Sequence, residues 1–192
     1  MLKRSFDILL SILCLIVFLP LALIVGVLIK LEDGGIVVFG QERIGRRGKP
    51  FTIYKFRSMN PNAEAEGVPQ LCNQDQDQRL TRIGRYIRQH HLDELPQLWN
   101  VLKGDMSFVG PRPEREYFIR QIVEADPRYT QLYAIRPGVT SYATLHNGYA
   151  DTMEKMLRRL ELDLYYLEHR TFILDCRILW LTFYRIAKGE KF

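Results

Sequence analysis

The feature that most constrains this chain is an unbroken apolar block near its N-terminus. Ile8–Ile29 contains 22 consecutive residues without a charge, and Ser11 carries its only hydroxyl. A helix of this length would extend about 33 Å, enough to cross a hydrocarbon core of about 30 Å. A helix in the core of a soluble protein would show a polar stripe, and this block shows none. We therefore predict a helix held in a membrane.

A cleavable signal peptide is the main alternative for this block, because Lys3 and Arg4 provide a basic start. The apolar region of a signal peptide is only about 7–15 residues long and ends at a small-residue cleavage site. Here the apolar run is longer and continues directly into Lys30, Glu32 and Asp33. The pattern favours a segment that stays in the membrane.

The flanks of the block predict how it enters the membrane. Pro20 lies near its middle and lacks the N–H that a helix needs, so we expect a kink or break there. Basic residues flank both ends, with Lys3 and Arg4 before the block and Lys30 and Arg43 after it. Basic flanks are typical of the cytoplasmic side, so a re-entrant helix–break–helix with both ends inside is expected. An ordinary single span remains the alternative.

The rest of the chain has the composition of one folded domain. Of the 192 residues, 47% are hydrophobic and 26% are charged, which excludes a disordered protein. The three cysteines are too few and too scattered for a disulfide framework or a four-ligand zinc site. We expect residues 1–31 to form the membrane helix and residues 32–192 a single cytosolic domain.

Short strands and helices alternate in this domain, which predicts an α+β fold of a monotopic membrane protein. Strands are expected at residues 36–39 and 51–56, joined by a basic loop. Residues 61–77 are polar and predict an exposed excursion. Helical patterns follow at residues 82–102, 114–125 and 153–168.

The last segment, residues 172–188, is apolar over most of its surface but carries Asp175, Arg177, Arg185 and Lys188. These charges argue against a transmembrane helix. Aromatic and basic side chains together are typical of a helix lying in the lipid headgroup layer. A buried helix of the globular core explains the segment equally well.

The densest group of chemically capable residues begins at the adjacent carboxylates Asp93 and Glu94. Pro96 disturbs the helix around Asp93 and can expose that carboxylate to a substrate. Asp93 suits nucleophilic attack, and Glu94 suits a hard cation bound through oxygen. A solvated helix face is the alternative for an isolated Asp–Glu pair.

Arginines and glycines surround this pair in the sequence. Residues 103–113 combine glycines and prolines with Arg112, and glycine backbones with an arginine fork suit phosphate oxygens. Lys55 and Arg57 alternate on one side of a predicted strand. Arg136 precedes a proline–glycine turn. Together these residues predict a site for a metal-bound diphosphate.

Two other patterns carry less weight. Asp75 and Asp77 match the Asp-x-Asp pattern of a nucleotide-sugar metal site, but they lie in a polar, Gln-rich stretch that predicts a solvated loop. His90 and His91 are adjacent, so they diverge on a helix and do not form an i, i+4 zinc pair. The basic residues are dispersed, and no nucleic-acid partner is expected.

In combination these motifs resemble the bacterial sugar transferase family. The apolar segment with Pro20, then YKFRSM, LDELPQLWNVLKGDMSFVGPRP and RPGVT, occur in the order found in its small monotopic phosphoglycosyl transferases. The similarity runs from about residue 1 to residue 187. It implies transfer of a phosphosugar from a UDP-sugar to undecaprenyl phosphate with release of UMP, which initiates a membrane-bound glycan. It also implies a location on the cytoplasmic face of the bacterial inner membrane.

The resemblance assigns roles to particular residues. It implies that Asp93 attacks the β-phosphate to form a covalent phosphosugar intermediate and that Glu94 helps to bind Mg²⁺. Arg112 is implied to contact phosphate. Weaker candidates for substrate binding are Lys55, Arg57, Arg88 and Arg136.

The chain departs from the family pattern at residues 141–144, which read Ser-Tyr-Ala-Thr where many members have Gly-x-Ala-Gln. The extra N-terminal spans of larger relatives are missing, so we expect a bare catalytic unit. The sequence does not identify the sugar, the glycan pathway or whether the chain forms a homo-oligomer. Downstream glycosyltransferases are expected partners. A catalytically silent scaffold and a metal-dependent glycosyltransferase using Asp75 and Asp77 are the competing hypotheses.

Overall fold

The computed structural model describes residues 2–60, 63, 77–148 and 150–189. Helices and strands alternate along the chain, as expected for an α+β fold. The elements in chain order are α1 Leu2–Asp33, β1 Val38–Ile44, η1 Arg46–Gly48, β2 Pro50–Phe56, α2 Arg82–Gln89, η2 Leu92–Glu94, α3 Gln97–Lys103, β3 Ser107–Val109, α4 Glu116–Ala125, η3 Pro127–Ala134, β4 Gly138–Thr140, α5 Tyr142–Asn147, α6 Met153–His169 and α7 Phe172–Lys188.

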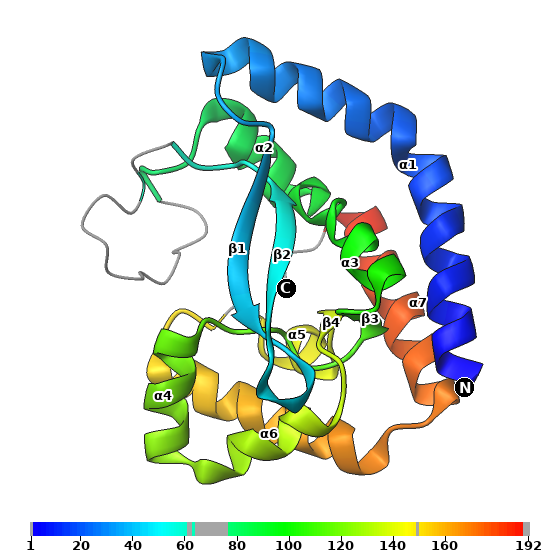
Figure 1. Cartoon of the computed structure of the whole chain (residues 1–192), viewed down its shortest axis with the longest axis vertical. Helices are drawn as coiled ribbons and strands as arrows, with labels where there is room; N and C mark the ends of the chain where they lie inside the picture. Colours follow the sequence, from blue (N-terminus) through cyan, green and yellow to red (C-terminus); the bar gives the residue numbers. More distant parts are fainter. Residues whose placement is uncertain (1, 61–62, 64–76, 149, 190–192) are drawn as a thin grey trace.

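The N-terminal apolar block forms a single helix, α1, that continues through Pro20. Figure 1 shows α1 running up one side of the molecule and then bending across its top. At Pro20, where a kink or break was expected, the chain stays helical and does not break. A proline removes one backbone hydrogen bond, and the turns on either side keep theirs.

The first turns of α1 are bound to the globular part of the molecule. Lys3 Nζ lies 2.5 Å from Asp175 of α7. Arg4 donates to the backbone carbonyls of Val101 and Leu102 at 2.6 and 2.9 Å. Asp7 is buried and accepts from the Ser107 hydroxyl at 3.1 Å.

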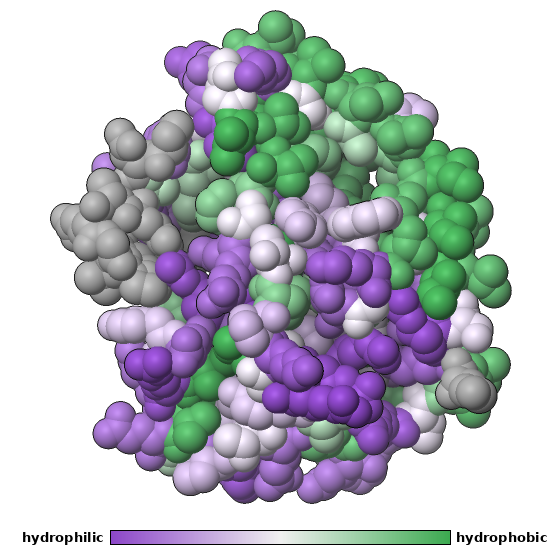
Figure 2. Space-filling model, viewed as in Figure 1, coloured by the Kyte–Doolittle hydropathy of each residue, from purple (hydrophilic) through white to green (hydrophobic). Residues whose placement is uncertain are grey.

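The other end of α1 is bound to the same body. Arg57, which follows β2, forms an ion pair with Asp33. Glu32 accepts from the backbone N–H groups of Arg82 and Ile83, at the start of α2, at 2.8 and 3.2 Å. The apolar residues between these two ends are largely exposed and give the molecule a continuous hydrophobic side (Figure 2); they include Leu9, Ile12, Leu13, Ile16, Val17, Leu19, Leu23, Ile24, Val27 and Leu28.

Two small sheets lie within the domain. β1 and β2 form an antiparallel hairpin, with Phe39 opposite Lys55, and β3 pairs with β4 in parallel. The buried Asn100 of α3 accepts from Tyr54 N–H at 3.0 Å and donates to the Thr52 carbonyl at 2.7 Å. This amide fixes β2 against the helix that follows Asp93 and Glu94.

The structure corrects two boundaries. The first strand begins at Val38 and extends to Ile44, so it includes part of the expected basic loop. The helix expected over residues 82–102 is divided into α2, η2 and α3. α2 ends at Gln89, because His91 takes a left-handed conformation with φ of 55°. α3 begins after Pro96.

The later helices are confirmed with small shifts, as α4, α6 and α7. α7 packs Ile178 into the main hydrophobic core, which also contains Val101, Met106 and Val109. Its other side exposes Ile173, Trp180 and Phe183. α7 is therefore not a fully buried core helix.

Candidate active site

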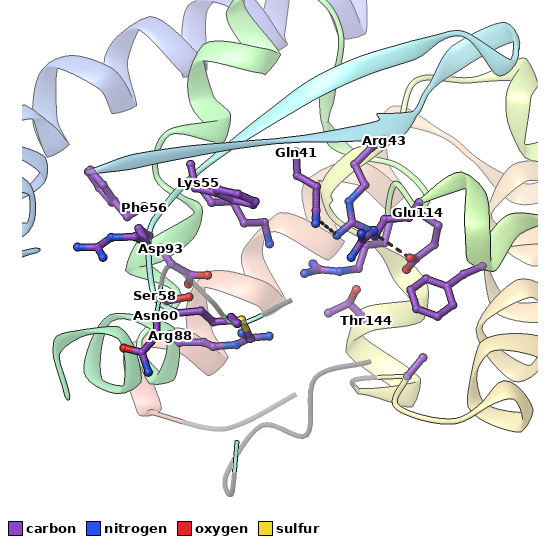
Figure 3. Close-up of a pocket in the computed structure, with 18 of the residues that line it drawn as sticks. Gln41, Arg43, Lys55, Phe56, Ser58, Asn60, Arg88, Asp93, Glu114 and Thr144 are labelled. Carbon is purple, nitrogen blue, oxygen red and sulfur yellow. Dashed lines mark hydrogen bonds and ion pairs between the residues drawn. The ribbon is translucent and has the colours of Figure 1, made fainter. Parts of the chain in front are cut away.

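A cavity of about 610 Å³ lies beside the β1–β2 hairpin (Figure 3). Its walls come from β1, β2 and the residues that follow it, from α2 and η2, and from the segment before α4. α5 and α6 contribute as well. Seven of the lining side chains are cationic and two are anionic; they are Arg43, Lys55, Arg57, Arg88, Arg112, Arg115 and Arg159 against Asp93 and Glu114. The excess of positive charge favours an anionic ligand.

Asp93 reaches this cavity because the chain leaves the helical conformation just before it. The left-handed His91 ends α2 and starts the short 3-10 turn η2, which carries Asp93 and Glu94. A left-handed conformation is uncommon for a residue with a side chain and concentrates at functional sites. Pro96 then opens α3, where its missing N–H is not needed.

Arg88 enters the cavity from α2, and a close backbone contact places this helix. A Cβ on Gly84 would lie 1.9 Å from the Ser58 carbonyl oxygen, so only glycine permits the approach. The Thr81 hydroxyl caps α2 by accepting from Gly84 N–H at 2.8 Å. Arg88 Nε is buried and has no hydrogen-bond partner among the described residues. It is therefore a donor available to a ligand.

Glu94 is held by two cations. Its Oε1 atom lies 2.8 Å from Lys55 Nζ and 2.9 Å from Arg112 Nη2. Burial works to raise the pKa of Glu94, but Lys55 and Arg112 hold it well below its usual range. Glu94 is therefore ionised, and it connects β2 to the segment carrying Arg112.

Asp93 has a different environment from its neighbour. It is 6% exposed, lines the cavity and points toward it from the side of Lys55 and Arg88 (Figure 3). Burial raises the pKa of the Asp93 carboxyl to about 6, although Lys55 opposes this shift. The carboxylate is thus ionised at neutral pH and poorly solvated, which suits a nucleophile. The alternative of a solvated helix face does not hold for Asp93, because this residue is buried.

A sequence model of bacterial sugar transferases matches residues 1–189. The chain belongs to the bacterial sugar transferase family. This confirms the resemblance that the motifs had indicated.

Three relatives illustrate the range of this family. UDP-N-acetylgalactosamine-undecaprenyl-phosphate N-acetylgalactosaminephosphotransferase from Aeromonas hydrophila is 43% identical over 97% of this chain and 44% of its own length. UDP-glucose:undecaprenyl-phosphate glucose-1-phosphate transferase from Escherichia coli K12 is 37% identical over 96% of this chain and 40% of its own. Exopolysaccharide production protein PSS from Rhizobium leguminosarum bv. phaseoli is 39% identical over 100% of this chain and 98% of its own length. The chain thus spans less than half of the first two relatives.

Of the seven site residues predicted from the sequence, five lie together. Asp93, Lys55, Arg88 and Arg112 line the cavity, and Glu94 contacts two of them. Arg57 also lines the cavity, but its guanidinium forms an ion pair with Asp33 and anchors the end of α1.

Arg136 lies apart from these residues. It is not among the cavity-lining residues, and its Nε donates to the Gly104 carbonyl at 2.8 Å. Asp77 forms an ion pair with Arg79 at 2.6 Å, and Asp75 lies outside the described residues. The structure therefore does not describe an Asp75–Asp77 pair.

Sequence reasoning missed a second group of charges on the cavity wall. Glu114 accepts from Arg43 Nη1 at 3.2 Å and from Arg159 Nη2 at 2.7 Å. Arg43 Nη2 also donates to the Gln41 side chain at 2.6 Å. The alternation of Phe39, Gln41 and Arg43 along one strand was the available signal, and it went unused because the strand was predicted to end at residue 39.

Glu94 and Asp93 are the carboxylates here that could bind a magnesium ion arriving with a diphosphate. Mg²⁺ typically takes one or two carboxylates and completes its shell with water and substrate phosphates. Glu94 supplies one ionised carboxylate next to the cavity, and Asp93 is adjacent. The described residues contain no cluster of three or more His, Cys, Asp or Glu side chains that could hold a metal alone.

Proposed function

We propose that this chain transfers a phosphosugar from a UDP-sugar to undecaprenyl phosphate and releases UMP. The names of its relatives support this function, since they describe undecaprenyl-phosphate sugar-phosphate transferases. The product would initiate a membrane-bound glycan. The observation that carries the proposal is the buried, cavity-facing Asp93 carboxylate beside the clamped Glu94.

The first half of the reaction uses Asp93 as the nucleophile. A carboxylate oxygen of Asp93 attacks the β-phosphorus of the UDP-sugar, and the bond from that phosphorus to the bridging oxygen breaks. UMP departs with the bonding electrons, and the phosphosugar stays on Asp93 as a mixed anhydride. Arg88 and Arg112 line the cavity, and in this proposal they bind the phosphate oxygens as charge moves toward the leaving group.

The second half returns the enzyme to its starting state. A phosphate oxygen of the lipid attacks the same phosphorus, and the bond to the Asp93 oxygen breaks. Asp93 leaves as a carboxylate, and the product is a lipid diphosphate sugar. The two steps together need no net proton transfer.

Glu94 is the residue that would hold Mg²⁺ in this proposal. When bound, the ion would neutralise part of the charge on the diphosphate and the departing UMP. Lys55 keeps Glu94 in position through the 2.8 Å ion pair.

We further propose that α1 is re-entrant and that the chain acts on the cytoplasmic face of the inner membrane. α1 is long and apolar enough to cross a membrane. Lys3 and Asp33, at opposite ends of α1, both bind the same globular body. A straight span would separate these ends by the bilayer, whereas a bent helix keeps both on one side. The exposed apolar side of α7 fits an interfacial position beside it.

The test of the function is a screen of UDP-sugars with purified full-length chain, undecaprenyl phosphate and Mg²⁺, followed by identification of the nucleotide product. We expect UMP with at least one UDP-sugar. Omitting the lipid should leave a phosphosugar adduct on the peptide containing Asp93, detectable by mass. Release of UDP, or product formation without any adduct on that peptide, would contradict the proposal.

A further inference from the structure

The inward face of β1 changes in character along its length. Side chains alternate between the two faces of a strand, so Phe39, Gln41 and Arg43 share one face. All three line the cavity, whereas Val38, Gly40 and Glu42 do not. This face therefore passes from an aromatic ring through an amide to a guanidinium within five residues.

The aromatic end of this face is exposed together with its neighbour Ile36. Ile36 is 61% exposed and Phe39 is 42% exposed, and both line the cavity. They follow directly after α1, whose last apolar residues Leu28 and Leu31 are also exposed. Figure 2 shows the hydrophobic surface of α1 continuing onto the region where β1 begins. The cavity thus opens at one end onto the apolar side of the molecule.

The reacting groups lie next to this apolar end. Phe39 is the cross-strand partner of Lys55, and Lys55 is ion-paired with Glu94. Asp93 and Arg88 line the same cavity. A ligand that reaches Asp93 along Ile36 and Phe39 therefore places an anionic head among cations and an apolar tail on the surface that continues into α1.

We infer that Ile36 and Phe39 form the binding site for the first isoprene units of the lipid phosphate acceptor. The inference depends on the proposed function. The acceptor has one anionic and one apolar part, and this end of the cavity offers the matching pair of environments in the matching order. Gln41, Arg43 and Glu114, at the polar end, are left for the sugar nucleotide.

The two-step reaction allows a specific test. Full-length chain in phosphatidylglycerol nanodiscs is first mixed with the UDP-sugar alone, and UMP release is measured. Undecaprenyl phosphate is then added, and decay of the adduct is followed. We expect Phe39→Ser to release UMP within twofold of the wild-type rate but to slow adduct decay about tenfold, because an apolar contact with the lipid is lost.

Val38→Ser is the matched control. Val38 is 45% exposed and lies on the same strand, but it does not line the cavity. We expect it to behave as wild type in both steps, and we expect Phe39→Leu to restore most of the adduct decay rate. A short, water-soluble alkyl phosphate should discharge the wild-type and Phe39→Ser adducts equally, since it has no isoprenoid chain.

Three results would overturn the inference. Phe39→Ser could leave adduct decay unchanged, Val38→Ser could slow it equally, or Phe39→Ser could slow reaction with the short phosphate as much as with the lipid. Loss of UMP release in Phe39→Ser, or a change in its oligomeric size, would also assign the residue a different role. Failure of the wild-type chain to release UMP or form the adduct would instead contradict the proposed function itself.

Discussion

Two carboxylate clusters in this molecule are built from the same kinds of residues, but their aspartates differ in access to the cavity. In the first, Glu94 is held by Lys55 and Arg112 beside Asp93. In the second, Glu114 is held by Arg43 and Arg159, with Asp163 one turn further along α6.

Each cluster contains an aspartate whose pKa is raised by burial, to about 6 for Asp93 and about 7 for Asp163. Asp93 lines the cavity, whereas Asp163 is not among the lining residues and is 2% exposed. A shifted pKa therefore does not by itself identify a catalytic group in this chain. Access to the ligand separates the two, and the following predictions test that separation.

The largest expected effect is on turnover. Asp93→Asn should lower the rate by about 10³-fold or more, because it removes the attacking oxygen. Asp163→Asn is the matched control, since it neutralises the other buried aspartate, and it should keep turnover within about threefold of wild type. Both rates are measured as UMP release under saturating substrates. Equal losses in the two variants would mean that access to the cavity does not distinguish the two aspartates.

The next effect concerns Mg²⁺. Glu94→Gln should raise the Mg²⁺ concentration for half-maximal activity by roughly 10–100-fold, because it replaces an ionised oxygen ligand. Glu114→Gln should leave that concentration unchanged, whatever it does to the maximal rate. Magnesium titrations of the two variants and the wild type provide the measurement. The same shift in both would assign the metal to neither glutamate in particular.

A smaller effect is expected on the pH dependence. Asp93 must be ionised to attack, so activity should fall as the pH drops through about 6. Among the groups that lower the pKa of Asp93, Lys55 has the largest influence. Lys55→Met should therefore move the acid limb of the kcat/KM profile upward by about one pH unit. Lys155→Met, an exposed lysine paired with Asp151, should leave the profile in place.

The smallest effect is on stability. The pKa of Asp163 is higher in the folded chain than in the unfolded one, so this residue reduces stability as the pH rises from about 4 to about 7. Asp163→Asn cannot ionise and should increase the free energy of unfolding by about 1–3 kcal/mol at pH 8.

This variant should give no increase at pH 4. Thermal unfolding of both proteins in nanodiscs at the two pH values provides the comparison. A gain at pH 4 as large as that at pH 8 would show that ionisation of Asp163 is not the cause.

Local patterns predicted much of the fold. The apolar run predicted α1, and periodic spacing predicted α4, α6 and α7 within a few residues. Local patterns failed between α2 and α3, where the spacing of apolar residues is helical but the chain turns at His91. The helical spacing of the apolar residues gave no sign of the left-handed conformation at His91.

Sequence motifs predicted one part of the candidate site and missed the other. Asp93, Glu94 and Arg112 stand in a recognisable motif. Glu114, Arg43 and Arg159 come from three separate segments, and only the packing of β1 and α6 around the segment before α4 brings them together. Arg136 shows the opposite case: its sequence position suggested a phosphate contact, but it is not among the residues that line the cavity.

The sequence by itself determined that the chain carries a helix long and apolar enough to cross a membrane, belongs among the sugar transferases and has a nucleophile candidate at Asp93. These conclusions depend only on which residue types follow one another along the chain, and this can be read from the sequence. The tertiary structure alone decided which carboxylate is buried yet accessible, which arginines face it, and that both ends of α1 meet one body. Burial and charge pairing depend on distances between segments far apart in the chain, and only the folded packing sets those distances.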